Sequence, residues 1–128
     1  MHHHRAFHKI PLSVIAAIFS LSLLLAGCSQ EKYGTGIDPA ALRIKTRDIF
    51  LQPQLIGKKV TVEGTVHTQC ASNGCWFVLQ DDTARIYIDL ATNNFQLPPM
   101  QGRTVRATGT VTSHQNNLLL VAEGVEAR

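Results

Sequence analysis

The residues best suited to chemistry lie in one short stretch between His67 and Trp76. Cys70 and Cys75 enclose four residues that end in Asn73-Gly74, and runs typical of strands precede and follow them. Asn and Gly tolerate positive φ, so this link predicts a hairpin turn with the cysteines facing each other at its mouth. Directly opposite residues have Cα atoms about 4.5–5.5 Å apart, within the range that a disulfide needs. The pattern predicts a Cys70–Cys75 disulfide.

Two other kinds of site remain open for the same residues. His67, Cys70 and Cys75 could supply an imidazole and two thiolates to a Cu(I) or Zn(II) ion, and His114 could add a fourth ligand from a later loop. A dithiol redox site is the third alternative. Its spacing has four intervening residues, where thioredoxin-type sites have two, and no helix N-terminus is predicted beside it.

The N-terminus reads as an export signal. The segment from Ile10 to Ala26 is apolar and uncharged but shorter than the roughly 20 residues of a membrane-spanning helix, as in the apolar core of a signal peptide. It ends in Leu25-Ala26-Gly27-Cys28, which resembles the lipobox of bacterial lipoproteins. The resemblance implies cleavage after Gly27, with a diacylglyceryl group on the Cys28 sulfur and an acyl chain such as palmitate on its nitrogen. The alternative is an uncleaved N-terminal anchor helix.

Export determines the expected location and the state of the cysteines. Ser29 follows the lipidated residue and favours the outer membrane, facing the periplasm, over retention at the inner membrane. The periplasm is oxidising, which favours a disulfide over two thiols. We therefore expect three segments: a signal peptide over 1–27, a lipidated Cys28 with a flexible tether over 28–44, and a folded domain over 45–128.

The charge balance and the absence of known catalytic motifs limit the classes of function that the sequence allows. Of the 12 Lys and Arg residues, Arg5 and Lys9 leave with the leader, so ten remain against nine Asp and Glu. This balance disfavours a sequence-independent nucleic-acid binder. No phosphate-binding glycine loop, nucleophile elbow or zinc-protease motif is present, and Asp81-Asp82 is typical of a solvated turn. We expect no enzymatic activity.

The domain is predicted to be all-β with short helical turns. Alternating apolar residues predict five strands, over 60–68, 76–80, 85–89, 103–112 and 118–122, with one helical turn at 53–56. Gly64 and Gly109 fall inside the first and fourth strands, where they predict sharp bends. Five strands with a longer third-to-fourth connection resemble an OB-fold barrel. The Cys70-to-Trp76 stretch also resembles a bacterial family of small exported OB-fold-like domains with a Gly-Cys-Trp start to the second strand. That match covers roughly residues 45 to 125.

Alternation also predicts a candidate ligand face. If Phe77, Leu79, Ile86 and Ile88 point inward, the outward residues are Trp76, Val78, Gln80, Arg85, Tyr87 and Asp89, alongside Thr65 and His67. Of these, the candidate ligand face consists of Thr65, Trp76, Val78, Arg85 and Tyr87. Aromatic residues on that face of an OB-fold can stack against sugars or nucleotide bases.

Together these features predict a lipid-anchored periplasmic OB-fold module of the cell envelope, with a binding or accessory role. Its partner would be an envelope protein or a small ligand on the outward face. The alternatives are a metal-binding lipoprotein that uses His67, Cys70 and Cys75 for copper or zinc, and an OB-fold oligonucleotide binder. Export makes nucleic acid an unlikely partner.

Overall fold

The computed structural model describes residues 9, 11–25 and 29–128. The predicted lipidation site, Cys28, lies outside the described residues. The elements are α1 (Leu12–Leu25), β1 (Glu31–Gly34), β2 (Leu42–Arg43), α2 (Thr46–Leu51), η1 (Pro53–Leu55), β3 (Lys59–Gln69), β4 (Trp76–Gln80), β5 (Arg85–Asp89), η2 (Ala91–Asn93), β6 (Thr104–His114) and β7 (Asn117–Ala127). Within this part of the chain, no helix combines the length and the apolar character needed to cross a membrane.

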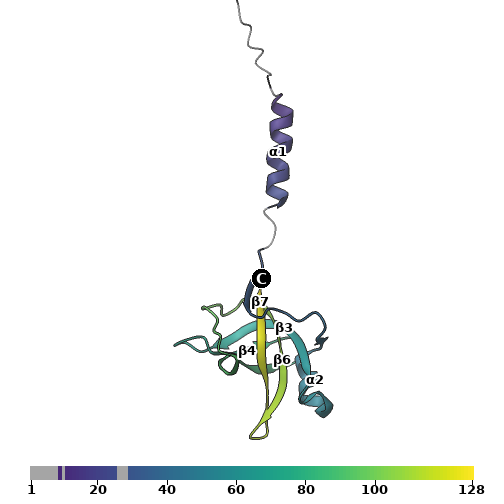
Figure 1. Cartoon of the computed structure of the whole chain (residues 1–128), viewed down its shortest axis with the longest axis vertical. Coiled ribbons are helices and arrows are strands. Elements are labelled where there is room, and N and C mark those ends of the chain that lie inside the picture. The colour runs from purple at the N-terminus through teal and green to yellow at the C-terminus, as the bar shows by residue number, and fades with distance from the viewer. Residues whose placement is uncertain (1–8, 10, 26–28) are drawn as a thin grey trace, which may run out of the picture.

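Five strands close into a barrel (Figure 1). β3 pairs with β4, β4 with β5, β5 with β7, β7 with β6, and β6 returns to β3. Only the β5–β7 pair within this ring is parallel; the other four pairs are antiparallel. Closure removes the open sheet edges of the ring, and the order of strands is that of an OB-fold. The predicted fold class is therefore confirmed.

The barrel core follows the alternation in the sequence. Phe77 and Leu79 on β4, with Ile86 and Ile88 on β5, are at most 2% exposed, and the residues between them face outward. Because successive side chains of a strand point to opposite faces, one face of this hairpin fills the barrel and the other faces away from the core.

Glycines allow β3 and β6 to bend. A Cβ atom at Gly64 would collide with the carbonyl group of Gln80, and one at Gly109 would collide with the carbonyl of Val121. The pairing of β6 with β7 also shifts register between Thr108 and Gly109. These two positions lie where each long strand serves two neighbours, as predicted.

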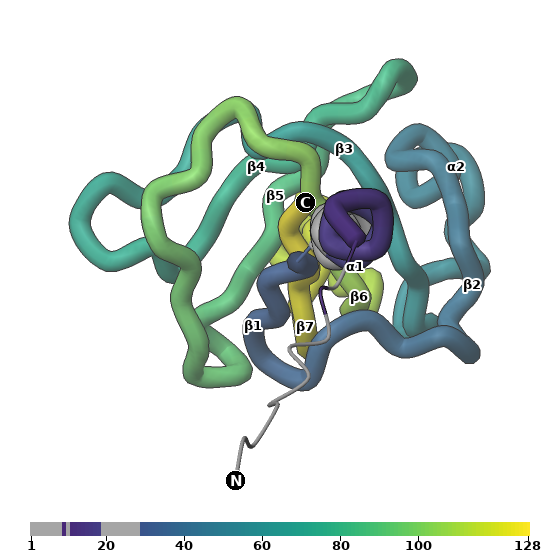
Figure 2. Tube along the Cα trace, turned by 90° about the horizontal axis from the view of Figure 1, so that it is seen from above, coloured from purple at the N-terminus to yellow at the C-terminus, as the bar shows by residue number. Residues whose placement is uncertain are grey.

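The expected flexible tether over residues 28–44 is wrong from residue 31 onward. β1 pairs antiparallel with β7, and β2 pairs parallel with β3 (Figure 2). Gly34 and Gly36 have φ of 61° and 74°, so they form a turn of fixed shape and not a pliable linker. The backbone of Gly36 lies so close to Gly124 that a Cβ atom on Gly124 would overlap it. Tertiary pairing with the edge of β7 orders this polar segment.

Asp81 is a structural carboxylate and not a solvated turn residue. It accepts four hydrogen bonds, from the backbone N–H groups of Thr46, Thr83 and Ala84 and from the Thr83 hydroxyl. Burial raises the pKa of this carboxyl, but the Thr83 hydroxyl and the three N–H groups outweigh burial and lower it well below its usual range. Asp81 thereby holds the start of α2 against the β4–β5 turn.

Candidate functional site

The hairpin of β3 and β4 carries both cysteines, and its register decides how they meet. Thr65 pairs with Gln80 and Val66 with Leu79, but beyond that point Thr68 pairs with Val78. His67 is therefore an extra residue in β3, a β-bulge that moves the later pairs by one position.

The bulge takes the two cysteines out of direct opposition. The backbone N–H of Cys70 donates to the carbonyl oxygen of Trp76 at 3.0 Å, so Cys70 lies opposite Trp76 and not opposite Cys75. Without the extra residue the same hairpin would pair Cys70 with Cys75, as the sequence led us to expect. Within the described residues both cysteines are thiols, and the predicted disulfide is not formed.

The loop nevertheless keeps the two cysteines close to each other. The N–H of Gly74 donates to the carbonyl of Cys70 at 3.3 Å, which closes the turn, and each cysteine side chain affects the pKa of the other. Gly74 has a φ of 63°, and a Cβ atom there would collide with the carbonyl oxygen of Leu97. The predicted need for glycine in this turn is confirmed at Gly74.

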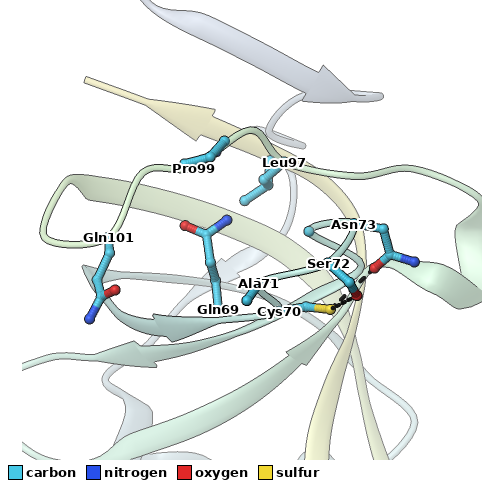
Figure 3. A pocket seen from close by; sticks show the side chains of 9 residues that line it. Gln69, Cys70, Ala71, Ser72, Asn73, Leu97, Pro99 and Gln101 are labelled. Atoms are coloured by element: carbon cyan, nitrogen blue, oxygen red, sulfur yellow. Dashed lines mark hydrogen bonds between the residues drawn. The ribbon is translucent and has the colours of Figure 1, made fainter.

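Cys70 and Cys75 lie in different surroundings. The Cys70 sulfur is 3.2 Å from the Ser72 hydroxyl and 3.2 Å from Oδ1 of Asn73, which accepts from the thiol form (Figure 3). The Ser72 hydroxyl, then the backbone N–H groups of Asn73 and Ser72, lower the pKa of Cys70 to about 6. Burial, followed by the neighbouring Cys70, raises the pKa of Cys75. Cys70 is therefore the better nucleophile of the two.

A groove of about 450 Å³ opens beside Cys70. Figure 3 shows Cys70, Ser72 and Asn73 along one side of it, with Leu97 and Pro99 across from them. Gln69 holds the two sides together, because its amide donates to the carbonyl of Pro98 at 3.1 Å and accepts from the N–H of Met100 at 2.7 Å. These two hydrogen bonds therefore hold the far wall of the groove in a fixed position.

The predicted ligand face lies on the outer side of the same hairpin. The rings of Trp76 and Tyr87 stack with centroids 5.5 Å apart and planes inclined by 23°. Val78 pairs with Tyr87 across β4 and β5, and Gln80 pairs with Arg85 and with Thr65. All five predicted residues therefore share this outer face, with Tyr87 42% exposed.

A cleft of about 430 Å³ adjoins the aromatic stack. Its wall consists of residues from β5, η2, β6 and β7: Tyr87, Asp89, Thr92, Thr112, His114, Leu119 and Val121. Our reading of the sequence left most of these residues out of the ligand face. Parallel pairing of β5 with β7 sets Tyr87 beside Leu119, and Leu119 in turn pairs with Thr112. The OB-fold strand order was the one signal that could have located them.

The thiol pair and the ligand face lie close enough to interact electrostatically. The pKa of Tyr87 is raised first by burial and then by negative charge on Asp89, Cys75 and Cys70. Asp89 and the two cysteines therefore lie close enough to Tyr87 to affect its ionisation.

The predicted metal ligands do not assemble. His114 lies in the cleft beside Tyr87, whereas His67 is the bulged residue of β3. Among the described residues, no group of three or more His, Cys, Asp and Glu side chains could hold a metal ion. The structure therefore does not support the four-ligand site considered from the sequence.

Comparisons with known proteins support the fold class of this chain. No protein-family model and no curated protein matches the sequence. The structure is similar to that of the hypothetical protein ygiW from E. coli, with a TM-score of 0.55 and 15% identity over 70% of this chain and 94% of that one. It is also similar to part of a Leishmania major Friedlin protein described as an aspartyl-tRNA synthetase, with a TM-score of 0.57 and 14% identity over 90% of this chain and 26% of that one. At such identities the likeness concerns the fold alone. With the closed strand order, it defines the chain as an OB-fold protein.

Proposed function

We propose that this protein is a non-enzymatic binding module of the bacterial cell envelope, anchored by lipid on Cys28, that takes an uncharged, sugar-like ligand. The observation that carries the proposal is the stacked Trp76–Tyr87 pair beside an open cleft. Ligand sites combine apolar and aromatic surface with a few polar groups that orient the ligand. The cleft has that composition, with Leu119 and Val121 beside Thr112, His114 and Asp89.

Charge favours an uncharged ligand over a nucleic acid. Asp89 pairs directly with Trp76 across β4 and β5, and Cys70 adds a negative charge near Tyr87 above about pH 6. The one basic side chain of the predicted face, Arg85, donates to Gln80 at 2.9 Å. A phosphate backbone laid on this face would meet repulsion where nucleic-acid binders provide Lys and Arg.

The ligand half of the proposal is tested with the single tryptophan as reporter. The full chain, held in detergent, is titrated with a β-1,4-linked N-acetylglucosamine oligomer while Trp76 fluorescence is followed. We expect a saturable change that Tyr87→Ala abolishes and that Phe50→Ala, at an exposed aromatic residue of α2, leaves intact. A silent response to neutral sugars, with salt-sensitive quenching by single-stranded DNA, would favour the oligonucleotide binder.

The envelope half rests on the leader and has its own test. The apolar segment Ile10 to Ala26, followed by Gly27-Cys28, supports export and lipidation. Cys28→Ala should abolish incorporation of labelled palmitate, because it removes the residue that carries the lipid. An unsubstituted chain that incorporates no palmitate and keeps its leader would support the uncleaved anchor helix.

A further inference from the structure

We propose that Cys70 and Cys75 form a redox-active dithiol, in which Cys70 attacks a disulfide of a peptide partner seated in the adjacent groove and Cys75 resolves the mixed disulfide. The ligand face makes no use of this chemistry, so the proposal goes beyond sugar binding. Three observations support it: two cysteines at the ends of one short loop, a hydroxyl 3.2 Å from only the Cys70 sulfur, and a groove whose lining includes Cys70.

The donors around Cys70 suit a thiolate. The Ser72 hydroxyl lies 3.2 Å from its sulfur, and the backbone N–H groups of Asn73 and Ser72 add to the lowering of its pKa. Hydrogen bonds to the charged form stabilise it, as at other reactive cysteines. With a pKa of about 6, Cys70 is mostly ionised at neutral pH, whereas the Cys75 thiol stays protonated until the mixed disulfide has formed.

The backbone of Cys75 is held in place while its sulfur stays next to Cys70. The Cys75 carbonyl accepts from the N–H groups of Leu90 at 3.0 Å and Ala91 at 3.2 Å, and its own N–H donates to Asn73 Oδ1 at 3.3 Å. The β-bulge at His67 keeps the cysteines out of a direct cross-strand pair. The two cysteines therefore stand at the ends of the short loop between β3 and β4, where a disulfide can form or break without disrupting the β3–β4 ladder.

The groove suits an uncharged peptide segment. Its lining is small, amide-bearing or apolar, from Gln69, Cys70, Ser72, Gly74, Leu97 and Gln101, and contains no charged side chain other than the Cys70 thiolate. Amides along both walls offer donors and acceptors to an extended backbone, and Leu97 with Pro99 offers apolar surface. Ala71, Ser72 and Asn73 are exposed, and Cys70 is one of the residues that line the groove.

The reaction balances as two exchanges. The Cys70 thiolate attacks one sulfur of the partner disulfide, forms a mixed disulfide and expels the other partner sulfur as a thiolate. Cys75, after losing its proton to that thiolate, attacks the Cys70 sulfur and expels the second partner sulfur. The protein dithiol is oxidised by two electrons to a Cys70–Cys75 disulfide, and the partner disulfide is reduced to two thiols. The reverse sequence oxidises a partner dithiol.

Glutathione disulfide, a tripeptide disulfide, serves as the probe. It is added to the full chain in detergent at pH 7, and peptide mass mapping locates each adduct. We expect Cys75→Ser to accumulate glutathione on Cys70, and Cys70→Ser to react at Cys75 at least about tenfold more slowly, because the thiolate is the reacting form. The unsubstituted chain should form the Cys70–Cys75 disulfide, release two glutathione thiols and return to the dithiol with excess reduced glutathione.

Equal rates at the two cysteines, or no adduct on Cys70 in the Cys75→Ser chain, overturn the proposal. A Cys70–Cys75 disulfide that excess reduced glutathione leaves closed overturns it as well and makes the pair a structural clasp. Limiting iodoacetamide on the unsubstituted chain provides a readout that needs no substitution, and it should label Cys70 before Cys75. The sugar titration follows Trp76 and not the thiols, so failure of the two proposals can be told apart.

Discussion

Cys70 lies opposite Trp76, with the Cys70 N–H 3.0 Å from the Trp76 carbonyl oxygen. One extra residue in β3, His67, produces this arrangement. It puts Cys70 opposite the first residue of β4 and leaves Cys75 between the turn and that strand. The reactive thiol and the ligand face therefore share one end of the β3–β4 hairpin.

Removal of the Ser72 hydroxyl should make Cys70 less acidic. In the unsubstituted chain, the rate of iodoacetamide alkylation at Cys70 should rise with a midpoint near pH 6. Ser72→Ala should move that midpoint upward, toward the ordinary thiol value of about 8.5, whereas Ser113→Ala, at an exposed position of β6, should leave it in place. Identical midpoints in all three chains would show that the hydroxyl does not stabilise the thiolate.

The Trp76–Tyr87 stack should contribute to stability as a coupled pair. Stacked aromatic pairs are worth about 0.5–1.5 kcal/mol beyond the area they bury. We expect a coupling free energy in that range between Trp76→Ala and Tyr87→Ala. It is measured in a double-mutant cycle by urea unfolding, with circular dichroism as the signal. The pair Phe50→Ala and Tyr87→Ala should be additive to within about 0.5 kcal/mol. Additivity in the first pair would mean that the rings only lie near each other.

Asp81→Asn should destabilise the fold and flatten its response to acid. Loss of a charge-assisted set of hydrogen bonds should cost about 1–3 kcal/mol at pH 7. The folded pKa of Asp81 is lowered, so its contribution is complete above the unfolded value of about 3.9 and is lost as the pH falls further. Between about pH 4 and about pH 3, which lie on either side of that unfolded pKa, the free energy of unfolding should therefore fall less in the variant than in the unsubstituted chain.

Asp82→Asn is the matched control for Asp81. The Asp82 side chain is 73% exposed and pairs with Lys45 at the surface, so its loss should cost clearly less than the loss of Asp81. Equal losses in the two variants would contradict the assignment of Asp81 as the structural carboxylate.

Gly124→Ala should free the N-terminal segment from the barrel. The added methyl group would overlap the backbone of Gly36, and such overpacking typically costs about 1–3 kcal/mol. Hydrogen exchange of residues 31–36 should become faster, because their bonds to β7 and Glu123 are lost. Unchanged protection would mean that this segment does not depend on its approach to Gly124.

The strands could be predicted from sequence because each has one buried face. Ile86 and Ile88 alternate with Arg85 and Tyr87, and this period of two is visible without a structure. The bulge at His67 could not be predicted, because an inserted residue near the end of a strand does not change the alternation of apolar and polar residues from which the strand is predicted. That single residue decided how Cys70 and Cys75 meet.

The remaining elements and site residues depend on pairing between strands that are far apart in the sequence, so the sequence alone did not reveal them. β1 and β2 are short, polar or exposed, and only their partners β7 and β3 reveal them as strands. His114 and Leu119 reach the side of Tyr87 through strand neighbours that are distant in sequence. Alternation could identify the aromatic half of the ligand face, whereas the other half depends on barrel closure.

The central claim is that the Trp76–Tyr87 stack and its cleft bind a sugar-like ligand. The most direct measurement is a two-dimensional NMR titration of the isotope-labelled full chain in detergent with an N-acetylglucosamine oligomer. The account predicts shifts for the Trp76 indole, the Tyr87 ring and the amides of Thr112 and Leu119, with Phe50 unchanged. Shifts confined to α2 and β2, or none at saturating oligomer, would contradict it.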